Sequence, residues 1–304
     1  MRVGFYGAGA MAHEIADASA AHGHETVAAL DVRRPAMPLE AVFVQTAAEL
    51  IAAQPDVVVH SPPRDGDLIG QISELLTGGC NVVSIAGAFH LGSSDPGGGD
   101  TLGRIAKEHG VSVIGTGVNP GFVLDLAPIF VSGACVRVDR IEARRVVDLR
   151  GYGESVSEMY GIGLSQLEFS EAVAGGRITL HRELVQSAHL IADATGIELG
   201  PIEEQKLPVL DGGTVAGFRH ICRAGDALEL ELHGLMRLDA VAATTISIKG
   251  DPGLEVVMSG GFSERPERIV AARVVNLFDW LVDSPPGLRS ITELPTALHN
   301  ARTA

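Results

Sequence analysis

Short apolar runs rich in β-branched residues alternate with longer stretches of helical spacing in the amino-terminal part of the chain. The runs predict strands at residues 2–6, 26–30, 41–45, 57–61, 81–85 and 112–115. Helices are expected around residues 11–22, 47–53, 67–76 and 101–109. Because strands that alternate with helices form a parallel sheet with crossover connections, this pattern predicts a doubly wound α/β domain.

One stretch of this part has no regular pattern. Residues 92–100 contain four glycines, one proline and two aspartates. Glycine loses the most backbone entropy when it becomes ordered, so we expect this stretch to be a surface loop.

The pattern changes after a helix expected at residues 122–131, because strand-like runs then follow one another. These runs lie at residues 139–149, 215–223, 227–238, 242–249 and 254–259, with a helix expected at 180–195. Such an order of elements predicts a second domain of α+β type with a largely antiparallel sheet. Residues 266–282 carry a broad apolar stripe of helical spacing, and we expect this helix to pack back onto the first domain.

A glycine-rich run joins the first predicted strand to the first predicted helix. It places Gly7, Gly9 and Ala12 in the pattern Gly-x-Gly-x-x-Ala. Gly7 permits a tight turn, Gly9 lets the backbone approach a pyrophosphate, and Ala12 lets the helix pack close to the strand. The N–H groups that begin the helix, at Ala10 and Met11, are suited to an anion. The run therefore predicts a dinucleotide site.

The second predicted strand ends in Asp31, 22 residues after Gly9. A carboxylate there can accept hydrogen bonds from the adenosine ribose hydroxyls and would repel a 2′-phosphate, so Asp31 favours NAD over NADP. Arg33 and Arg34 could instead pair with a 2′-phosphate if Asp31 turned aside. A solvated loop explains the two arginines equally well.

With this site in place, the predicted organisation has three parts. Residues 1–121 form the dinucleotide-binding domain, residues 122–262 form a substrate and dimerisation domain, and residues 263–304 form a helix and a tail that return to the first domain. A length of 304 residues suits two domains.

The composition of the chain argues against several kinds of binding partner. The net charge of −15 argues against nucleic acid, because that affinity depends on lysine and arginine displacing counterions. No apolar run is long enough to span a bilayer and no signal peptide follows Met1, so we expect no membrane association. Cys80, Cys135 and Cys222 lack metal-ligand spacing, so we expect no metal site and a reducing, cytoplasmic location.

Ligands of an open α/β sheet bind outside the carboxyl ends of the strands. At the predicted ends of the fourth to sixth strands stand His60 and Ser61, then Ala86, then Asn119. Asn119 could orient the nicotinamide or the substrate, because a side-chain amide both donates and accepts hydrogen bonds. Its place in an Asn-Pro-Gly sequence explains the residue equally well as a turn former.

Several segments together resemble a known family of enzymes. They are residues 115–122, 176–193, 249–254 and 271–295. These segments resemble those of the 2,4-diaminopentanoate dehydrogenases and related NAD(P)-dependent amine dehydrogenases, whose Rossmann domain is similar to that of the dihydrodipicolinate reductases. The resemblance implies an N-terminal Rossmann domain and an oxidoreductase that acts on C–N bonds.

The chain departs from that family after the fifth predicted strand. The amine dehydrogenases usually carry a pair of glutamates there, one of which is thought to hold the substrate amine and to act in proton transfer. Gly87 and Ala88 occupy that position and cannot accept a proton. Three alternatives are open. Either another residue has taken the role of the glutamate, or the reaction needs no acid–base group at that point, or the substrate supplies its own charge.

Three histidines are candidates for the missing role, because imidazole exchanges protons near neutral pH. His60 and His90 lie at predicted strand ends, and His181 matches a turn histidine that precedes a helix in the family. Each of the three could equally be structural, and of them we rank His181 first.

The glycine-rich segment 150–163 is the other source of candidates. It is either a lid that carries Glu154, Glu158 and Tyr160 over the cofactor or a plain connecting loop. We rank Tyr160 with His181, since the second domain is expected to close over the nicotinamide.

The dinucleotide motif predicts an NAD(P)-dependent oxidoreductase. The resemblance implies that it moves a hydride between nicotinamide and the carbon of an imine–amine pair, or of a ketone with an amine, with a carbonyl–alcohol pair as the other substrate type. The alternative is a non-catalytic NAD(P)-binding redox sensor or assembly subunit, which the lack of an acid–base group at Gly87 and Ala88 favours. We expect a small-molecule amine, imine or ketone substrate and a homodimer.

Overall fold

The computed structural model describes residues 1–31, 41–62, 66–150, 154–181, 183–236, 241–261 and 265–295. The chain forms two compact units. The first contains residues 1–121 and 267–304, and the second contains residues 122–266. Each unit is built around its own sheet.

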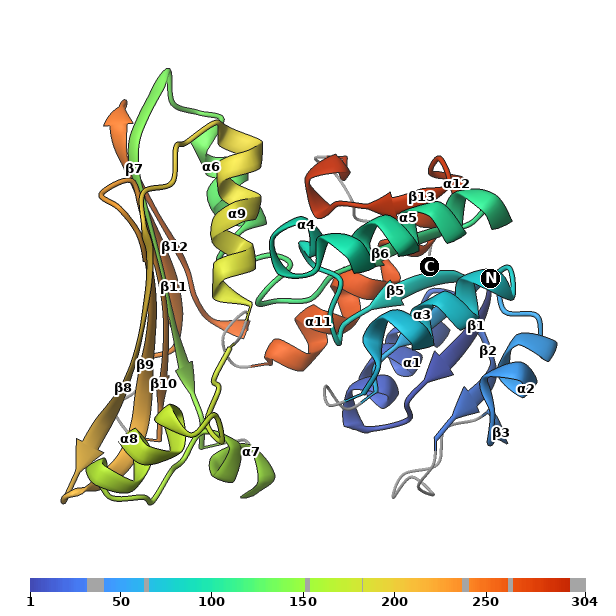
Figure 1. Ribbon diagram of the computed structural model, residues 1–304, viewed down its shortest axis with the longest axis horizontal. Helices are drawn as coiled ribbons and strands as arrows, with labels where there is room; N and C mark the ends of the chain where they lie inside the picture. Colours follow the sequence, from blue (N-terminus) through green and yellow to red (C-terminus); the bar gives the residue numbers. More distant parts are fainter. Residues whose placement is uncertain are drawn as a thin grey trace. The chain divides into compact units, whose positions relative to one another are not determined.

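The described part of the first unit holds a seven-stranded sheet in which every pair of neighbouring strands is parallel (Figure 1). Its order is β13 (Gly287–Arg289), β6 (Ser112–Gly115), β5 (Asn81–Ser84), β4 (Val57–His60), β1 (Arg2–Tyr6), β2 (Glu25–Leu30) and β3 (Val42–Val44). The predictions of strands at 2–6 and 112–115, and of a doubly wound sheet, are confirmed.

Helices bury both faces of this sheet. They are α1 (Ala10–Ala21), α2 (Ala47–Ala52), α3 (Leu68–Thr77), α4 (Leu91–Ser94), α5 (Pro96–His109), α11 (Pro266–Val275) and α12 (Phe278–Asp283), and a short 3₁₀ helix, η1 (Ile291–Glu293), follows. Ile72 of α3 and Leu102 of α5 pack in one core cluster with Val58 and Val82, while Val57 and Val59 on the opposite face of β4 are also without exposed surface. Continuous apolar runs such as 57–59 are typical of strands covered on both sides.

The prediction of a surface loop at residues 92–100 is wrong. The structure has α4 there, followed by the first turn of α5. The Asp95 side chain accepts a hydrogen bond from the Gly98 N–H at 2.9 Å, and Pro96 takes the first helical position. An N-cap aspartate followed by proline is a strong helix start, and it outweighs the entropy cost of the glycines.

The carboxyl-terminal part of the first unit also differs from the prediction. The expected helix at 266–282 is two helices, α11 and α12, which are separated at Asn276 and Leu277. Strand β13 then adds to the sheet by pairing with β6, as Leu288 lies opposite Val113. This edge strand was not predicted, because three residues are too few to show an alternation.

The second unit contains a six-stranded sheet among its described residues. Its order is β12 (Leu254–Met258), β11 (Ala243–Asp251), β7 (Arg137–Asp148), β10 (Leu228–Leu235), β9 (Thr214–Ala224) and β8 (Ile202–Asp211). All neighbours are antiparallel except β7 and β10. The predicted largely antiparallel second sheet is confirmed, although β8 was missed.

Four described helices accompany this sheet: α6 (Leu126–Ser132), α7 (Glu154–Met159), α8 (Gln166–Ala174) and α9 (Leu184–Thr195). Within the unit, α6 and α9 lie side by side along one face (Figure 1). The expected helix at 122–131 begins later, at Leu126, because the Asp125 carboxylate caps it by accepting the Leu126 N–H at 2.6 Å.

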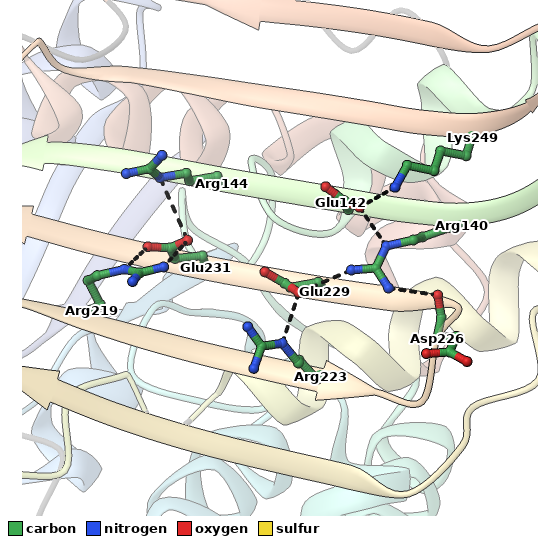
Figure 2. A network of polar contacts seen from close by, with 9 residues as sticks. All are labelled: Arg140, Glu142, Arg144, Arg219, Arg223, Asp226, Glu229, Glu231 and Lys249. Carbon is green, nitrogen blue, oxygen red and sulfur yellow. Dashed lines mark hydrogen bonds and ion pairs between the residues drawn. The ribbon is translucent and has the colours of Figure 1, made fainter.

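The other face of the six-stranded sheet carries a network of charged side chains (Figure 2). Glu231, which is 5% exposed, accepts from Arg219 at 2.6 Å and lies 3.7 Å from Arg144. Glu229 joins Arg140 to Arg223 at 3.0 and 2.9 Å. The carboxylates hold the long arginine side chains in place across neighbouring strands, so paired charges cover the middle of this face.

None of the helices in the described ranges is long and apolar enough to cross a membrane.

Candidate active site

The turn between β1 and α1 is built around two glycines with different tasks. Gly7 has φ +99°, and a Cβ there would lie 2.6 Å from the Ser61 carbonyl oxygen, so no other residue fits. Gly9 is the N-cap of α1 and has an ordinary extended φ of −77°. Among the described residues, no atom would lie within 4 Å of a Cβ at Gly9. As far as those residues go, the backbone at Gly9 faces open space, as a passing pyrophosphate requires.

Asp31, at the end of β2, is tied to this turn. Its Oδ2 accepts the Ala8 N–H at 2.9 Å. The acid thus stands beside the glycine turn, and its role towards a ribose stays a prediction. Arg33 and Arg34 lie outside the described residues.

Ser61 connects the end of β4 to the same turn. Its hydroxyl donates to the Gly7 carbonyl at 3.1 Å, and its N–H donates to the Tyr6 carbonyl at 2.8 Å. Its neighbour His60 has no exposed surface. Burial lowers the pKa of His60 from 6.5 to about 4, so the ring is neutral at pH 7. Because the ring is enclosed, only the backbone of His60 can face a ligand.

The end of β5 is shaped by Ser84. Its Oγ accepts the N–H groups of Ala86 at 3.3 Å and Gly87 at 3.2 Å. Ala88 follows with φ +63°, a conformation that costs energy for a residue with a Cβ. His90 lies further on, where its Nδ1 is 2.8 Å from the Ser93 hydroxyl.

The loop after β6 holds buried polar atoms that lack a partner. Asn119 precedes a cis proline, and neither its side-chain oxygen nor its side-chain nitrogen has a hydrogen-bond partner among the described residues. The Thr116 hydroxyl is without exposed surface and also has no hydrogen-bond partner among those residues. Buried amides are usually paired, so Asn119 is suited to a ligand that both donates and accepts.

A dinucleotide fits this set of residues. Within the described part of the chain, the space at Gly9 could admit a pyrophosphate, Asp31 could accept from ribose hydroxyls, and the Asn119 amide, unsatisfied there, could pair with a nicotinamide carboxamide. All three residues belong to the first unit.

The structure brings together Tyr160 and His181, the two residues of the second unit that ranked first by sequence. The Tyr160 hydroxyl is 3.3 Å from His181 Nε2, and the ring centroids are 6.3 Å apart. The ring of Phe218, on β9, lies 4.7 Å from that of Tyr160 and supports it. A phenol bonded to an imidazole can pass a proton between them.

The two glutamates of the same segment were the other candidates of the second unit. Glu158 is exposed on α7, while the side chain of Glu154 lies outside the described residues. The predicted segment 150–163 contains helix α7, and its residues 151–153 are likewise outside the described ranges.

Sequence reasoning missed a buried polar contact in the second unit. Asp125 has no exposed surface, and its Oδ2 accepts the Ser187 hydroxyl at 2.9 Å. This bond ties the start of α6 to α9. An aspartate directly before an apolar helical run is an N-cap signal, which could have located Asp125 but not its partner.

Among the described residues, no group of three or more His, Cys, Asp or Glu side chains is arranged to hold a metal ion.

The family model described as the 2,4-diaminopentanoate dehydrogenase C-terminal domain matches residues 122–302, which are more than half of the chain. The chain belongs to this family. The resemblance to 2,4-diaminopentanoate dehydrogenases that was drawn from the sequence is thereby confirmed.

Two relatives show how much of the chain resembles known dehydrogenases. The 2,4-diaminopentanoate dehydrogenase of Acetoanaerobium sticklandii is 33% identical over 215 residues, which are 64% of this chain and 60% of that protein. An amine dehydrogenase of Streptomyces virginiae is 24% identical over 294 residues, which are 81% of this chain and 79% of that protein. The chain thus matches 60% of the length of the first relative.

A solved structure has the same fold over nearly the full length of this chain. The amine dehydrogenase from Mycobacterium smegmatis superposes with a TM-score of 0.81 and covers 99% of this chain and 97% of its own, at 22% identity. At that identity the likeness shows the fold, which is the two-sheet architecture described above.

Proposed function

We propose that the chain is an NAD(P)-dependent oxidoreductase that acts on C–N bonds. The observation that carries this proposal is the turn at Gly7 and Gly9, which is open at Gly9 and flanked by Asp31. Family membership supplies the C–N chemistry. When bound, the nicotinamide would supply or accept the hydride, and the protein would supply position and a proton path.

The residues of the first unit would bind and orient the cofactor. The Gly9 backbone and the first N–H groups of α1, at Ala10 and Met11, would hold the pyrophosphate, since none of the described side chains caps that helix. Asp31 would accept bonds from the ribose hydroxyls, and Asn119 would fix the carboxamide. Because Asp31 already stands against the turn, its charge would repel a 2′-phosphate, and we propose a preference for NAD.

The Tyr160–His181 pair would exchange the proton with the substrate in place of the missing glutamate. Tyr160 would donate its phenolic proton to the imine nitrogen, and a proton carried on His181 Nε2 would then pass to the phenolate. An amine, an imine or a ketone with an amine is the class of substrate that this pair would serve.

Cofactor binding is the first test, and the structure supplies a clean variant. Gly9→Asp has an allowed φ and room for its Cβ, so it should fold normally while losing NADH and NADPH binding in calorimetry, because a carboxylate would occupy the pyrophosphate position. Ala20→Asp, exposed near the other end of α1, adds the same charge and should keep binding. A wild-type chain that binds neither nucleotide would refute the proposal.

Turnover is the second test. The chain should be incubated with NADH or NADPH and a panel of ketones with ammonia or methylamine, cyclic imines and keto acids. His181→Ala and Tyr160→Phe should each lower turnover by about 10²–10⁴-fold and leave cofactor affinity unchanged. If both variants keep full turnover, the pair does not carry the proton.

A non-catalytic redox sensor is the second candidate. It is favoured by the turn after β5, where Gly87 and Ala88 offer no side chain that exchanges protons. Tight cofactor binding with no turnover on the whole panel would support it, and turnover of any one member would exclude it.

We also propose a homodimer that forms through the charged face of the second sheet. Arg144 is opposite Thr245 and Thr245 is opposite Val257, so the 57% exposed Val257 side chain shares that face with the network. Sedimentation at micromolar concentration should show a dimer for the wild type and for Val282→Asp, a control on α12, and a monomer for Val257→Asp. A monomeric wild type would contradict the dimer.

A further inference from the structure

Three side chains form a line of hydrogen bonds beneath the carboxyl ends of β4 and β5. His60 lies between them, with Nδ1 3.1 Å from Ser84 Oγ and Nε2 3.0 Å from Gln71 Oε1. His60 and Ser84 stand directly opposite each other in the paired strands, and both are without exposed surface. Gln71 comes from α3.

The donors and acceptors of this line allow one arrangement. Ser84 Oγ already accepts the N–H groups of Ala86 and Gly87, so its own proton is available to be donated to His60 Nδ1. Nδ1 must then be the unprotonated nitrogen, and Nε2–H donates to the Gln71 carbonyl oxygen. The protonation follows from the network, in which each member fixes the next.

The line ends on a turn that is held from several sides. Ser84 binds two consecutive N–H groups of that turn, and the next residue, Ala88, has φ +63°. On the neighbouring strand, a Cβ at Gly115 would come within 2.4 Å of the Ala88 carbonyl. The close approach of Gly115 and the two bonds to Ser84 both restrict the backbone of this turn.

The turn lies at the edge where the cofactor is proposed to bind. Across the sheet, Tyr6 is paired with His60, His60 with Ser84, and Ser84 with Gly115, so these four strand ends are level. The glycine turn follows Tyr6 and the Asn119 loop follows Gly115. Residues 85–88 therefore stand between the two ends of the proposed dinucleotide site.

We infer that His60 and Ser84 are positioning residues that set the affinity for the nicotinamide cofactor by fixing the backbone of residues 85–88. Neither side chain touches the cofactor, because both are enclosed. The chain has no glutamate at Gly87 or Ala88 to hold a ligand, so the shape of this backbone is what the turn contributes. The inference rests on the proposed function.

Ser84→Ala is the decisive variant, and Ser112→Ala is its matched control. Ser112 is a serine of 1% exposure on the adjacent strand β6, at the opposite end of the sheet, and its hydroxyl donates to the Pro285 carbonyl at 3.2 Å. Each change removes one buried hydroxyl, so both should lower the urea midpoint. Only Ser84→Ala should raise the NADH dissociation constant, by about tenfold, because it releases two N–H groups of the turn.

Gln71→Leu gives a milder variant that keeps Ser84 and removes only the outer bond. It should raise the dissociation constant by about threefold, and in Gln71→Leu/Ser84→Ala the two effects should not multiply, since they act through one path. Equal NADH affinity in Ser84→Ala and Ser112→Ala, or multiplying effects in the double variant, would overturn the inference. A wild type that binds no NADH or NADPH would instead overturn the proposed function.

Discussion

Mild acid should destabilise the first unit through His60. The ring is without exposed surface, and burial lowers its pKa from 6.5 to about 4. In the unfolded chain the same imidazole titrates near its ordinary pKa, so between the two values the unfolded chain binds a proton that the folded chain does not. The free energy of unfolding therefore falls as the pH drops from 7 towards 4.

The size of the effect follows from the two pKa values. At about 1.4 kcal/mol per pKa unit, the difference between 6.5 and about 4 corresponds to a loss of about 3 kcal/mol once the pH reaches 4. About 2 kcal/mol of this should already be lost at pH 5. A domain is stable by only about 5–15 kcal/mol, so the change is easily measured.

Urea unfolding at pH 7 and pH 5 tests this on the wild type and on His60→Asn, whose side chain does not titrate. The fluorescence of Trp280, the one tryptophan of the chain, reports on the first unit because it lies in α12. Other titrating groups are common to both proteins and cancel in the comparison. His60→Asn should lose about 2 kcal/mol less than the wild type between the two pH values. Equal losses would show that the ring is not held neutral by burial.

Two further predictions concern buried groups. Burial raises the pKa of Cys80 to about 11 and, with Glu204 nearby, that of Cys222 to about 12. In native protein at pH 8, iodoacetamide should therefore modify Cys135 alone by mass spectrometry; early labelling of another thiol would contradict this. Ser187→Ala should lower the free energy of unfolding by about 1–3 kcal/mol, because a buried carboxylate loses a donor, whereas Ser170→Ala at an exposed site should change it by less than about 0.5 kcal/mol in the same urea titration.

The local elements of the first sheet could be predicted because their signals lie within a few residues. Strands β1 and β6 carry short runs rich in apolar residues and are observed at the predicted residues. β8 was missed because residues 203–206 are all polar or charged and Pro208 interrupts the run, while its pairing with β9 decides its conformation. β13 depends on a partner more than 170 residues earlier in the chain, which no local window contains.

The candidate site also has a part that local sequence predicts and a part that depends on the tertiary structure. The glycine turn and Asp31 have fixed spacing, so sequence alone located them, and the contact from Asp31 to the Ala8 N–H is the structure's addition. Tyr160 and His181 were chosen separately, and their hydrogen bond depends on how α7 and the start of α9 are placed by the second sheet. The enclosure of His60 is a tertiary property, since its ring is bonded by Ser84 of β5 and Gln71 of α3 and lies against the Tyr6 ring of β1.

The late pairing of β13 with β6 has a consequence for how the protein is made. The second unit, residues 122–266, is inserted between the two parts of the first. During synthesis one edge of β6 therefore stays unpaired until residues 287–289 have been translated. Unpaired edges invite association with other chains, and contacts between distant residues form slowly. The second unit, being continuous in sequence, can complete its contacts before the first unit, so the sheet edge at β6 is the last part of the chain to be covered.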